Sequence, residues 1–147
     1  MKISTKGRYA LRMLVDLAAN EGKGFVALKD IAQRQQISKK YLEQIVPLFN
    51  GAGILEANRG FQGGYKLARK AEEYTVGEIL RLTEGSLAPV ACLEYSPNRC
   101  ERCDDCETLY VWEGLHRAIT EYLDEITLQD IINKQNRKRR QTDIVLL

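Results

Sequence analysis

The chain has 147 residues, a formal net charge of +2, four cysteines and a single histidine. This length suits one domain with a hydrophobic core, or a small domain with a helical extension, and leaves no room for more. No apolar run of about eighteen residues and no signal-type apolar core is found, so we expect a soluble cytoplasmic protein with no membrane partner.

Charge is distributed unevenly along the chain. Residues 1–70 hold 13 Lys or Arg against 5 Asp or Glu, giving +8, whereas residues 71–147 hold 9 against 15, giving −6. A basic half on a nearly neutral protein indicates a surface for a polyanion such as nucleic acid. A solvated lysine-rich surface is the alternative that charge alone leaves open.

The first 35 residues predict two helices. Ser4 and Thr5 can cap a long first helix, in which apolar residues recur at helical spacing as far as Ala18 before a glycine-rich turn. Leu28 and Ile31 mark a short second helix. A tight polar turn follows it.

A third helix is predicted from Ser38, whose side chain suits the N-cap position. One face is apolar and the opposite face carries Lys39, Lys40, Glu43, Gln44 and Pro47. A short helix, a tight turn and a capped second helix with such a polar face follow the helix-turn-helix plan, in which long side chains read base edges in the major groove. Because proline has no amide N–H, we expect the helix to bend or end at Pro47.

Residues 54–57 and 65–67 read as two strands joined by a turn over residues 58–64. A hairpin placed after a helix-turn-helix is a wing, and Arg59 near its tip could enter a narrow minor groove. A solvent-exposed turn residue is the alternative for Arg59. A capping box at Thr75 then opens a further helix, which closes the basic domain near residue 85.

All four cysteines lie within a segment of fifteen residues, as Cys92, Cys100, Cys103 and Cys106. In a reducing cytosol, clustered cysteines are more often metal ligands or redox thiols than disulfides. An iron-sulfur cluster and a zinc ion both suit four thiolates. A ferredoxin-like electron carrier is disfavoured because Cys92 precedes the closely spaced cysteines and no proline follows them.

Residues beyond the cysteines predict a long helix with a packing seam. Seam positions recur at intervals of three and four residues, at Leu109, Trp112, His116, Ile119, Leu123 and Ile126. With no helix of matching length elsewhere in the chain, we assign this seam to self-association. Thr127 then caps a short terminal helix, and a basic run over residues 137–140 begins a polar tail.

The expected fold is mainly α with a small β-hairpin, an α+β winged helix-turn-helix DNA-binding domain plus a long dimerisation helix. Residues 1–85 form the DNA-binding domain, and residues 86–107 form a loop that carries the cysteines. Residues 108–135 form the dimerisation helix and C-terminal helix, and residues 136–147 form the tail.

Three stretches carry a family likeness: Thr5-Lys6-Gly7-Arg8-Tyr9-Ala10, Ile37-Ser38 with Tyr41-Leu42-Glu43-Gln44, and Arg59-Gly60 with Gly63-Gly64-Tyr65-Lys66-Leu67-Ala68-Arg69. Together with the later cysteines, they resemble the IscR-type family of winged-helix iron-sulfur transcription regulators. The resemblance implies a homodimer that binds operator DNA through the second helix of the motif and the wing. It also implies a cluster held by three cysteines, which fall here on Cys92, Cys100 and Cys106, with a base-reading Glu43 and a minor-groove Arg59.

The fourth cluster ligand does not transfer from the family. Leu109 stands where IscR proteins usually have a histidine, and Arg8 stands where the nitric-oxide sensors have an acidic residue. Cys103 is the simplest replacement, with an oxygen donor such as Glu107, or a residue of the partner chain, as alternatives. His116 lies about 15 Å along a helix from Cys106, too far to share one cluster.

The sequence therefore predicts a dimeric repressor-type regulator whose operator binding is controlled by an iron-sulfur cluster, 2Fe-2S in preference to 4Fe-4S, and which regulates cluster biogenesis genes. The alternative is a winged-helix regulator that uses the cysteines for structural zinc or a thiol redox switch. An enzyme with a small-molecule substrate is not expected, because the single histidine leaves no base for a nucleophile. The expected DNA-binding residues are Ser38, Lys39, Lys40, Tyr41, Glu43, Gln44, Arg59 and Gly60.

Overall fold

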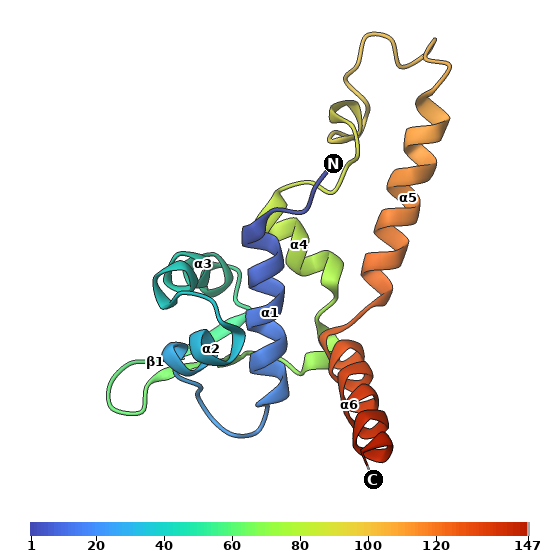
Figure 1. Ribbon diagram of the computed structural model, residues 1–147. Coiled ribbons are helices and arrows are strands. Elements are labelled where there is room, and N and C mark those ends of the chain that lie inside the picture. Colours follow the sequence, from blue (N-terminus) through green and yellow to red (C-terminus); the bar gives the residue numbers. More distant parts are fainter. Residues whose placement is uncertain (147) are drawn as a thin grey trace.

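The computed structural model describes residues 1–146 and confirms a mainly helical fold with one β-hairpin (Figure 1). Its elements are α1 (Thr5–Ala19), α2 (Leu28–Gln35), α3 (Lys39–Gly51), β1 (Leu55–Asn58), β2 (Gly64–Leu67), η1 (Ala71–Glu73), α4 (Val76–Glu84), η2 (Ala91–Leu93), α5 (Leu109–Glu125) and α6 (Leu128–Val145). None of these described helices is long and apolar enough to cross a membrane.

Helix α1 is the centre of the N-terminal domain, which the sequence predicts to bind DNA. The Ser4 hydroxyl caps it by accepting the Gly7 amide at 3.0 Å. Its buried residues include Ala10, Met13 and Leu14, each 0% exposed, and α2, α3, α4, α6 and β2 all contact it. Burying one helix on several sides fixes the positions of the elements around it.

The expected helix-turn-helix is formed by α2 and α3. The chain leaves α2 through Gln36, which adopts the left-handed conformation with φ 54°, and the Ser38 hydroxyl accepts the Tyr41 amide at 3.0 Å. Helix α3 continues past Pro47 to Gly51, so of the two expected effects of Pro47, a bend or an end, the end does not occur. Pro47 is exposed, so the Glu43 carbonyl that loses its partner can reach water, while the apolar stripe on the other face holds the helix in the core.

The wing, residues 55–67, is a two-stranded antiparallel hairpin in which Leu55 pairs with Leu67 and Asn58 with Gly64. Tyr65 also exchanges two backbone hydrogen bonds of 2.8 and 2.9 Å with Val26. The wing therefore attaches to the segment between α1 and α2, and Figure 1 shows it projecting from the side of α1 opposite α5.

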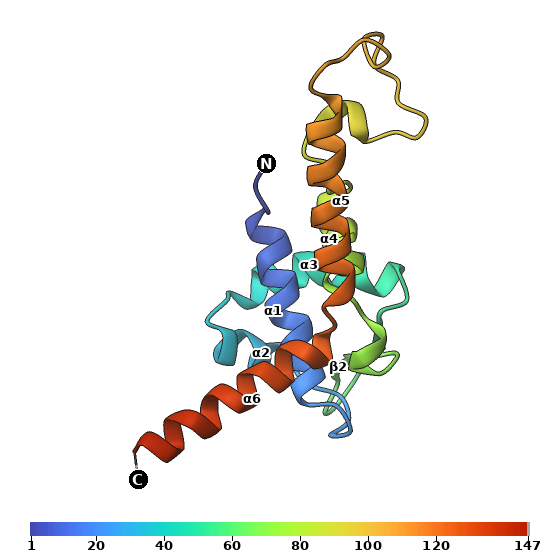
Figure 2. The same cartoon turned by 90° about the vertical axis from the view of Figure 1, so that its right-hand side faces the viewer.

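Helix α5 carries the cysteine loop, residues 86–108, at one end and α6 at the other (Figures 1 and 2). Helix α6 begins with a capping box in which Thr127 and Asp130 each bond the other's amide. Leu128 and Ile132 are buried against the domain, and the rest of α6 projects into solvent (Figure 2).

The short terminal helix followed by a tail was a wrong expectation, because α6 runs unbroken to Val145. The boundary predicted at residue 135 falls inside this helix. Residues 134–141 are all Lys, Arg or Gln except Asn136, and these three residue types are good helix formers even without an apolar stripe.

Candidate nucleic-acid interface and cysteine loop

The start of α3 and the wing face each other across an open groove of about 410 Å³. Four of the predicted DNA-binding residues line it: Lys39, Glu43, Arg59 and Gly60. The groove is therefore built from both parts of a winged helix-turn-helix that meet DNA, the polar face of the second helix and the hairpin turn.

Three polar residues of this groove were missed by the sequence reasoning: Lys29, Asn50 and Asn58. Asn58 is adjacent to Arg59 and could have been included on that ground. Lys29 lies at the start of α2 and Asn50 at the end of α3. These two reach the groove only through the tertiary fold, so no local pattern identifies them.

Lys39, Lys40, Glu43 and Gln44 are exposed on the outer face of α3. Lys39 Nζ lies 3.5 Å from Glu43 Oε1, one helical turn away, and both side chains are more than half exposed. Such an exposed pair is weak and opens readily to other partners. The Glu43 carboxylate is therefore available to a ligand in the groove, and the exposed Lys40 ammonium lies outside it.

Ser38 and Tyr41 have structural roles in α3. The Ser38 hydroxyl is occupied by the Tyr41 amide. The Tyr41 ring is half-buried and packs edge-on against Tyr9, with 5.4 Å between ring centroids. These two predicted DNA-binding residues therefore hold the reading helix on α1, and their contact with DNA stays a prediction.

Arg59 is exposed at the wing turn and forms no ion pair within residues 1–146. The turn depends on glycine: Gly60 has φ 114°, and a Cβ on Gly63 would lie 2.5 Å from the Asn58 carbonyl oxygen. This tight turn presents a free guanidinium at the edge of the groove.

A buried carboxylate fixes α2 against α1. Asp16 is 5% exposed and accepts two hydrogen bonds from Arg34, at 2.7 and 3.0 Å, and one from Gln35 at 3.0 Å. The hydrogen bond to Asp16 raises the pKa of Arg34 above its ordinary value. Because α2 leads directly into the turn before α3, this pairing sets the direction from which α3 emerges.

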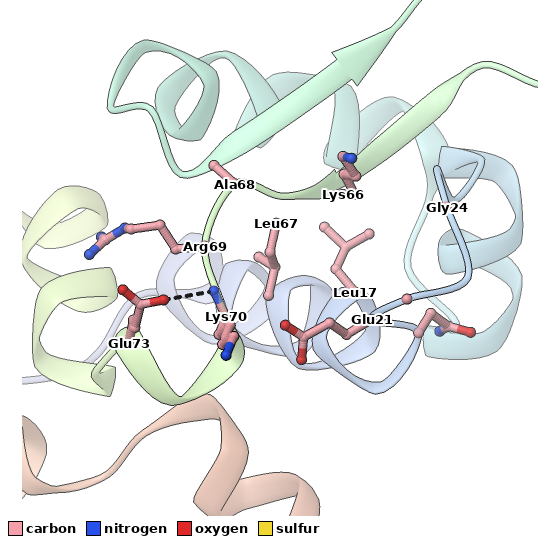
Figure 3. Close-up of a pocket in the computed structure, with 11 residues that line it drawn as sticks. Leu17, Glu21, Gly24, Lys66, Leu67, Ala68, Arg69, Lys70 and Glu73 are labelled. Atoms are coloured by element: carbon pink, nitrogen blue, oxygen red, sulfur yellow. Dashed lines mark hydrogen bonds between the residues drawn. The ribbon is translucent and has the colours of Figure 1, made fainter.

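A second cleft, of about 550 Å³, lies between the end of α1 and the segment that follows β2 (Figure 3). Two of its three basic side chains have partners, since Lys66 pairs with Glu56 at 3.3 Å and Arg69 with Glu78 at 3.2 Å. Figure 3 also shows the Lys70 amide bonded to Glu73 across its floor. These contacts support the base of the wing.

The cysteine loop carries four thiols, none of them in a disulfide. Cys100 is exposed and the others are partly buried, and the Cys103 amide donates to the Cys100 carbonyl at 3.2 Å. Within residues 1–146, no three Cys, His, Asp or Glu side chains converge to form a metal site. The donor set suits a soft metal or a cluster, so the predicted ligands fit by chemistry and would have to be gathered by movement of the loop.

The thiols differ in acidity. A hydrogen bond with the Thr108 hydroxyl, at 3.6 Å, lowers the pKa of Cys106. Desolvation, together with the carboxylate of Asp104, raises the pKa of Cys103. Cys106 therefore has the more nucleophilic and more metal-competent sulfur near neutral pH.

The predicted seam on α5 is partly used within the chain. Ile119, Leu123 and Ile126 pack against a cluster of three buried residues formed by Val76, Leu80 and Leu87. Although α4 has nine residues and does not match the seventeen of α5, it covers this half of the seam, which the assignment to self-association does not anticipate. The largest exposed apolar side chains of α5 lie mainly outside the predicted seam, at Tyr110, Val111, Trp112, Leu115 and Tyr122.

Known proteins are similar to this chain in both sequence and fold. A sequence profile of the Rrf2 family, described as an iron-dependent transcriptional regulator, matches residues 3–134. Protein rrf2 of Nitratidesulfovibrio vulgaris is 41% identical over 132 residues, which cover 90% of this chain and 87% of that protein.

Two solved structures extend the comparison. CymR, described as the global cysteine regulator of B. subtilis, has a TM-score of 0.78 at 38% identity, covering 91% of this chain and 98% of CymR. IscR of T. potens has a TM-score of 0.75 at 41% identity, covering 92% of this chain and 88% of IscR. The resemblance to IscR-type regulators is confirmed, and these relatives are regulators and not enzymes, as expected. The chain belongs to the Rrf2 family of DNA-binding transcriptional regulators.

Proposed function

We propose that this regulator reads operator DNA with the groove between α3 and the wing, and that an iron-sulfur cluster on the cysteine loop controls the binding. The observation that carries the DNA part is the shared groove, which is lined by both Glu43 and Arg59. Glu43 accepts a hydrogen bond from the cytosine amino group in the major groove, and Arg59 enters the adjacent minor groove.

The cluster is held by Cys92, Cys100 and Cys106, with Cys103 as the simplest fourth ligand. Iron-sulfur clusters are held by cysteine thiolates. None of the four cysteines forms a disulfide, and all four lie on one loop at the end of α5. When bound, the cluster supplies an iron centre whose oxidation or loss changes the charge and the ligands of this loop. The favoured form is 2Fe-2S, and the regulated genes are those of cluster biogenesis.

The regulator acts as a homodimer through the exposed side of α5. Val111, Leu115 and Tyr122 are 42%, 41% and 65% exposed and share one helical face at spacings of four and seven residues. Helix α4 leaves this apolar face of α5 uncovered. A second copy of the chain related by a two-fold axis could cover it, because the same residues of both copies would meet at the axis. Two reading heads would then contact two half-sites.

A second candidate is a thiol-controlled regulator. It is favoured by the lowered pKa of Cys106, which suits redox chemistry or thiolate binding to zinc. The similarity to CymR, whose solved structure is described as that of a cysteine regulator, also points in this direction.

Anaerobic purification followed by visible absorption and metal analysis separates the two candidates. A cluster predicts a coloured protein with iron and inorganic sulfide. Cys92→Ala, Cys100→Ala and Cys106→Ala should each lose the colour, with Cys103→Ala testing the fourth ligand. A colourless, iron-free protein that contains zinc, or that changes DNA affinity on oxidation, would support the second candidate instead.

A further inference from the structure

Tyr74 links the base of the wing to the far side of the domain. Its side chain is 0% exposed, and its hydroxyl donates to the Ile54 carbonyl at 3.2 Å and accepts the Arg69 amide at 3.0 Å. Ile54 directly precedes β1, and Arg69 follows β2 after one residue. This hydroxyl therefore bonds both ends of the hairpin, which the Ala68 amide also joins by donating to the Ile54 carbonyl at 2.9 Å.

The backbone of the same residue belongs to a different contact. The Tyr74 carbonyl accepts the Leu128 amide at 3.0 Å, and the Val76 amide donates to the Ile126 carbonyl at 2.8 Å. These two bonds form an isolated antiparallel bridge, here called the joint, between residues 74–76 and residues 126–128. The joint lies where α5 ends and α6 begins.

The wing depends on such attachments because it has little core of its own. Each strand has four residues, and of β1 only Leu55 is buried. A hairpin of two strands is marginally stable by itself in water. Its direction is therefore set by the hydrogen bonds to Val26 on one side and by Tyr74 at its base. Figure 3 shows the adjacent turn, in which Ala68 and Arg69 lead from β2 towards η1.

We propose that Tyr74 is the positioning residue that couples the wing to the joint, so that movement of α5 reaches Arg59 through this side chain. The inference rests on the proposed function and specifies how its control would reach the DNA. Tyr74 touches neither the cysteines nor the groove, so its effect on binding passes through the wing. A second attachment reinforces the path, since the Arg69 guanidinium lies 4.5 Å from the centre of the Tyr74 ring.

Tyr74→Phe removes the hydroxyl and keeps the ring in the core. Hydrogen exchange of the wing amides, residues 55–67, should become about tenfold faster or more, because the variant loses both hydrogen bonds of this hydroxyl. Ile79→Val is the matched control, because Ile79 is also 0% exposed but makes no hydrogen bond to the wing. Unchanged wing exchange in Tyr74→Phe, or equal acceleration in the control, would overturn the proposal.

A double-mutant cycle tests the connection to DNA on a duplex selected from a random pool. Tyr74→Phe should weaken binding, and Tyr74→Phe with Arg59→Ala should bind like Arg59→Ala alone, because both changes remove the wing contact. If the losses of DNA affinity caused by Tyr74→Phe and Arg59→Ala multiply in the double variant, as expected for Ile79→Val with Arg59→Ala, the proposed path is contradicted. If the wild type selects no duplex, the proposed function fails, while wing exchange still decides the role of Tyr74.

A third variant tests whether α5 is coupled to the wing through the joint. Val76→Pro removes the joint bond to Ile126 at the first position of α4, where proline is well tolerated, and leaves the hydroxyl contacts in place. In both Val76→Pro and Tyr74→Phe, the ratio of DNA affinities between iron-loaded and iron-free protein should approach one, with the cluster spectrum unchanged. A wild-type ratio retained in both variants would exclude coupling through Tyr74.

Discussion

Glu43 is the side chain on which we expect base discrimination to depend. It is about half exposed, lines the groove, and pairs with Lys39 only through a weak surface contact of 3.5 Å. Lys40 is also exposed on α3 but does not line the groove, which suits contact with phosphate. These two residues should therefore affect binding in different ways.

Glu43→Ala should change the preferred base at one position of the selected duplex and leave the salt dependence of binding unchanged. Lys40→Ala should weaken binding to all sequences and reduce the slope of log affinity against log salt by about one. Binding titrations at several salt concentrations check both results. Identical behaviour of the two variants would remove Glu43 from base reading.

Gly64 is required where the wing meets the rest of the domain. A Cβ at this position would collide with the Val26 carbonyl oxygen, which itself accepts the Tyr65 amide. Gly64→Ala should lower the free energy of unfolding by about 1–3 kcal/mol and weaken DNA binding, as urea unfolding and titration would measure. Gly51→Ala is the control, because it has open space around it and should be neutral or stabilising.

Sequence reasoning located the caps and the turn residues well, since their signals are local. Ser4, Ser38, Thr75 and Thr127 all cap helices as expected from their residue type and position. It did not show that the Ser38 hydroxyl is already occupied. A serine at this position suits either a helix cap or a DNA contact, and only the folded structure shows which role its hydroxyl has.

Helices α4 and α5 are held together by an ion pair as well as by apolar packing. Arg81 donates two hydrogen bonds of 2.8 Å to Asp124, and this pairing lowers the pKa of Asp124 below its ordinary 3.8. A Cβ at Gly77 would collide with the Asp124 carboxylate, so a larger residue there would displace this side chain from Arg81.

A carboxylate with a depressed pKa stabilises the folded state at neutral pH and loses that effect as the pH falls through its folded pKa. Asp124→Asn should lower the free energy of unfolding by about 0.5–1 kcal/mol at pH 7, a small value because both partners are over a third exposed. In urea unfolding, the difference from wild type should shrink below about pH 4. A difference that stays constant from pH 7 to pH 3 would show that the charge is not involved.

At the scale of elements, the interval pattern on α5 predicted a packing seam but not its partner. Leu123 would recur at the same spacing whether it met a second chain or α4. Helix α6 was underestimated for a related reason, since its outer half has no apolar stripe to mark it. Periodicity of apolar residues identifies the buried face of a helix. It predicts neither a helix that is exposed on all sides nor the surface that covers a buried face.

For the whole molecule, the account requires two copies joined through α5. Leu115→Glu places a charge on the exposed apolar face, which lies beside the side that packs on α4, and should convert the dimer to a folded monomer. Sedimentation would measure the mass, and Glu113→Gln serves as a control on the same helix. A wild type that sediments as a monomer would rule out this interface.

Operator affinity with and without iron is the most direct test of the central claim, that sulfur-held iron at the end of α5 controls the reading groove. Anaerobically purified protein and the same protein after chelation are titrated with one selected duplex at one salt concentration. The account predicts affinities that differ by about tenfold or more, a typical allosteric coupling. Equal affinities of the iron-loaded and iron-free forms would contradict it.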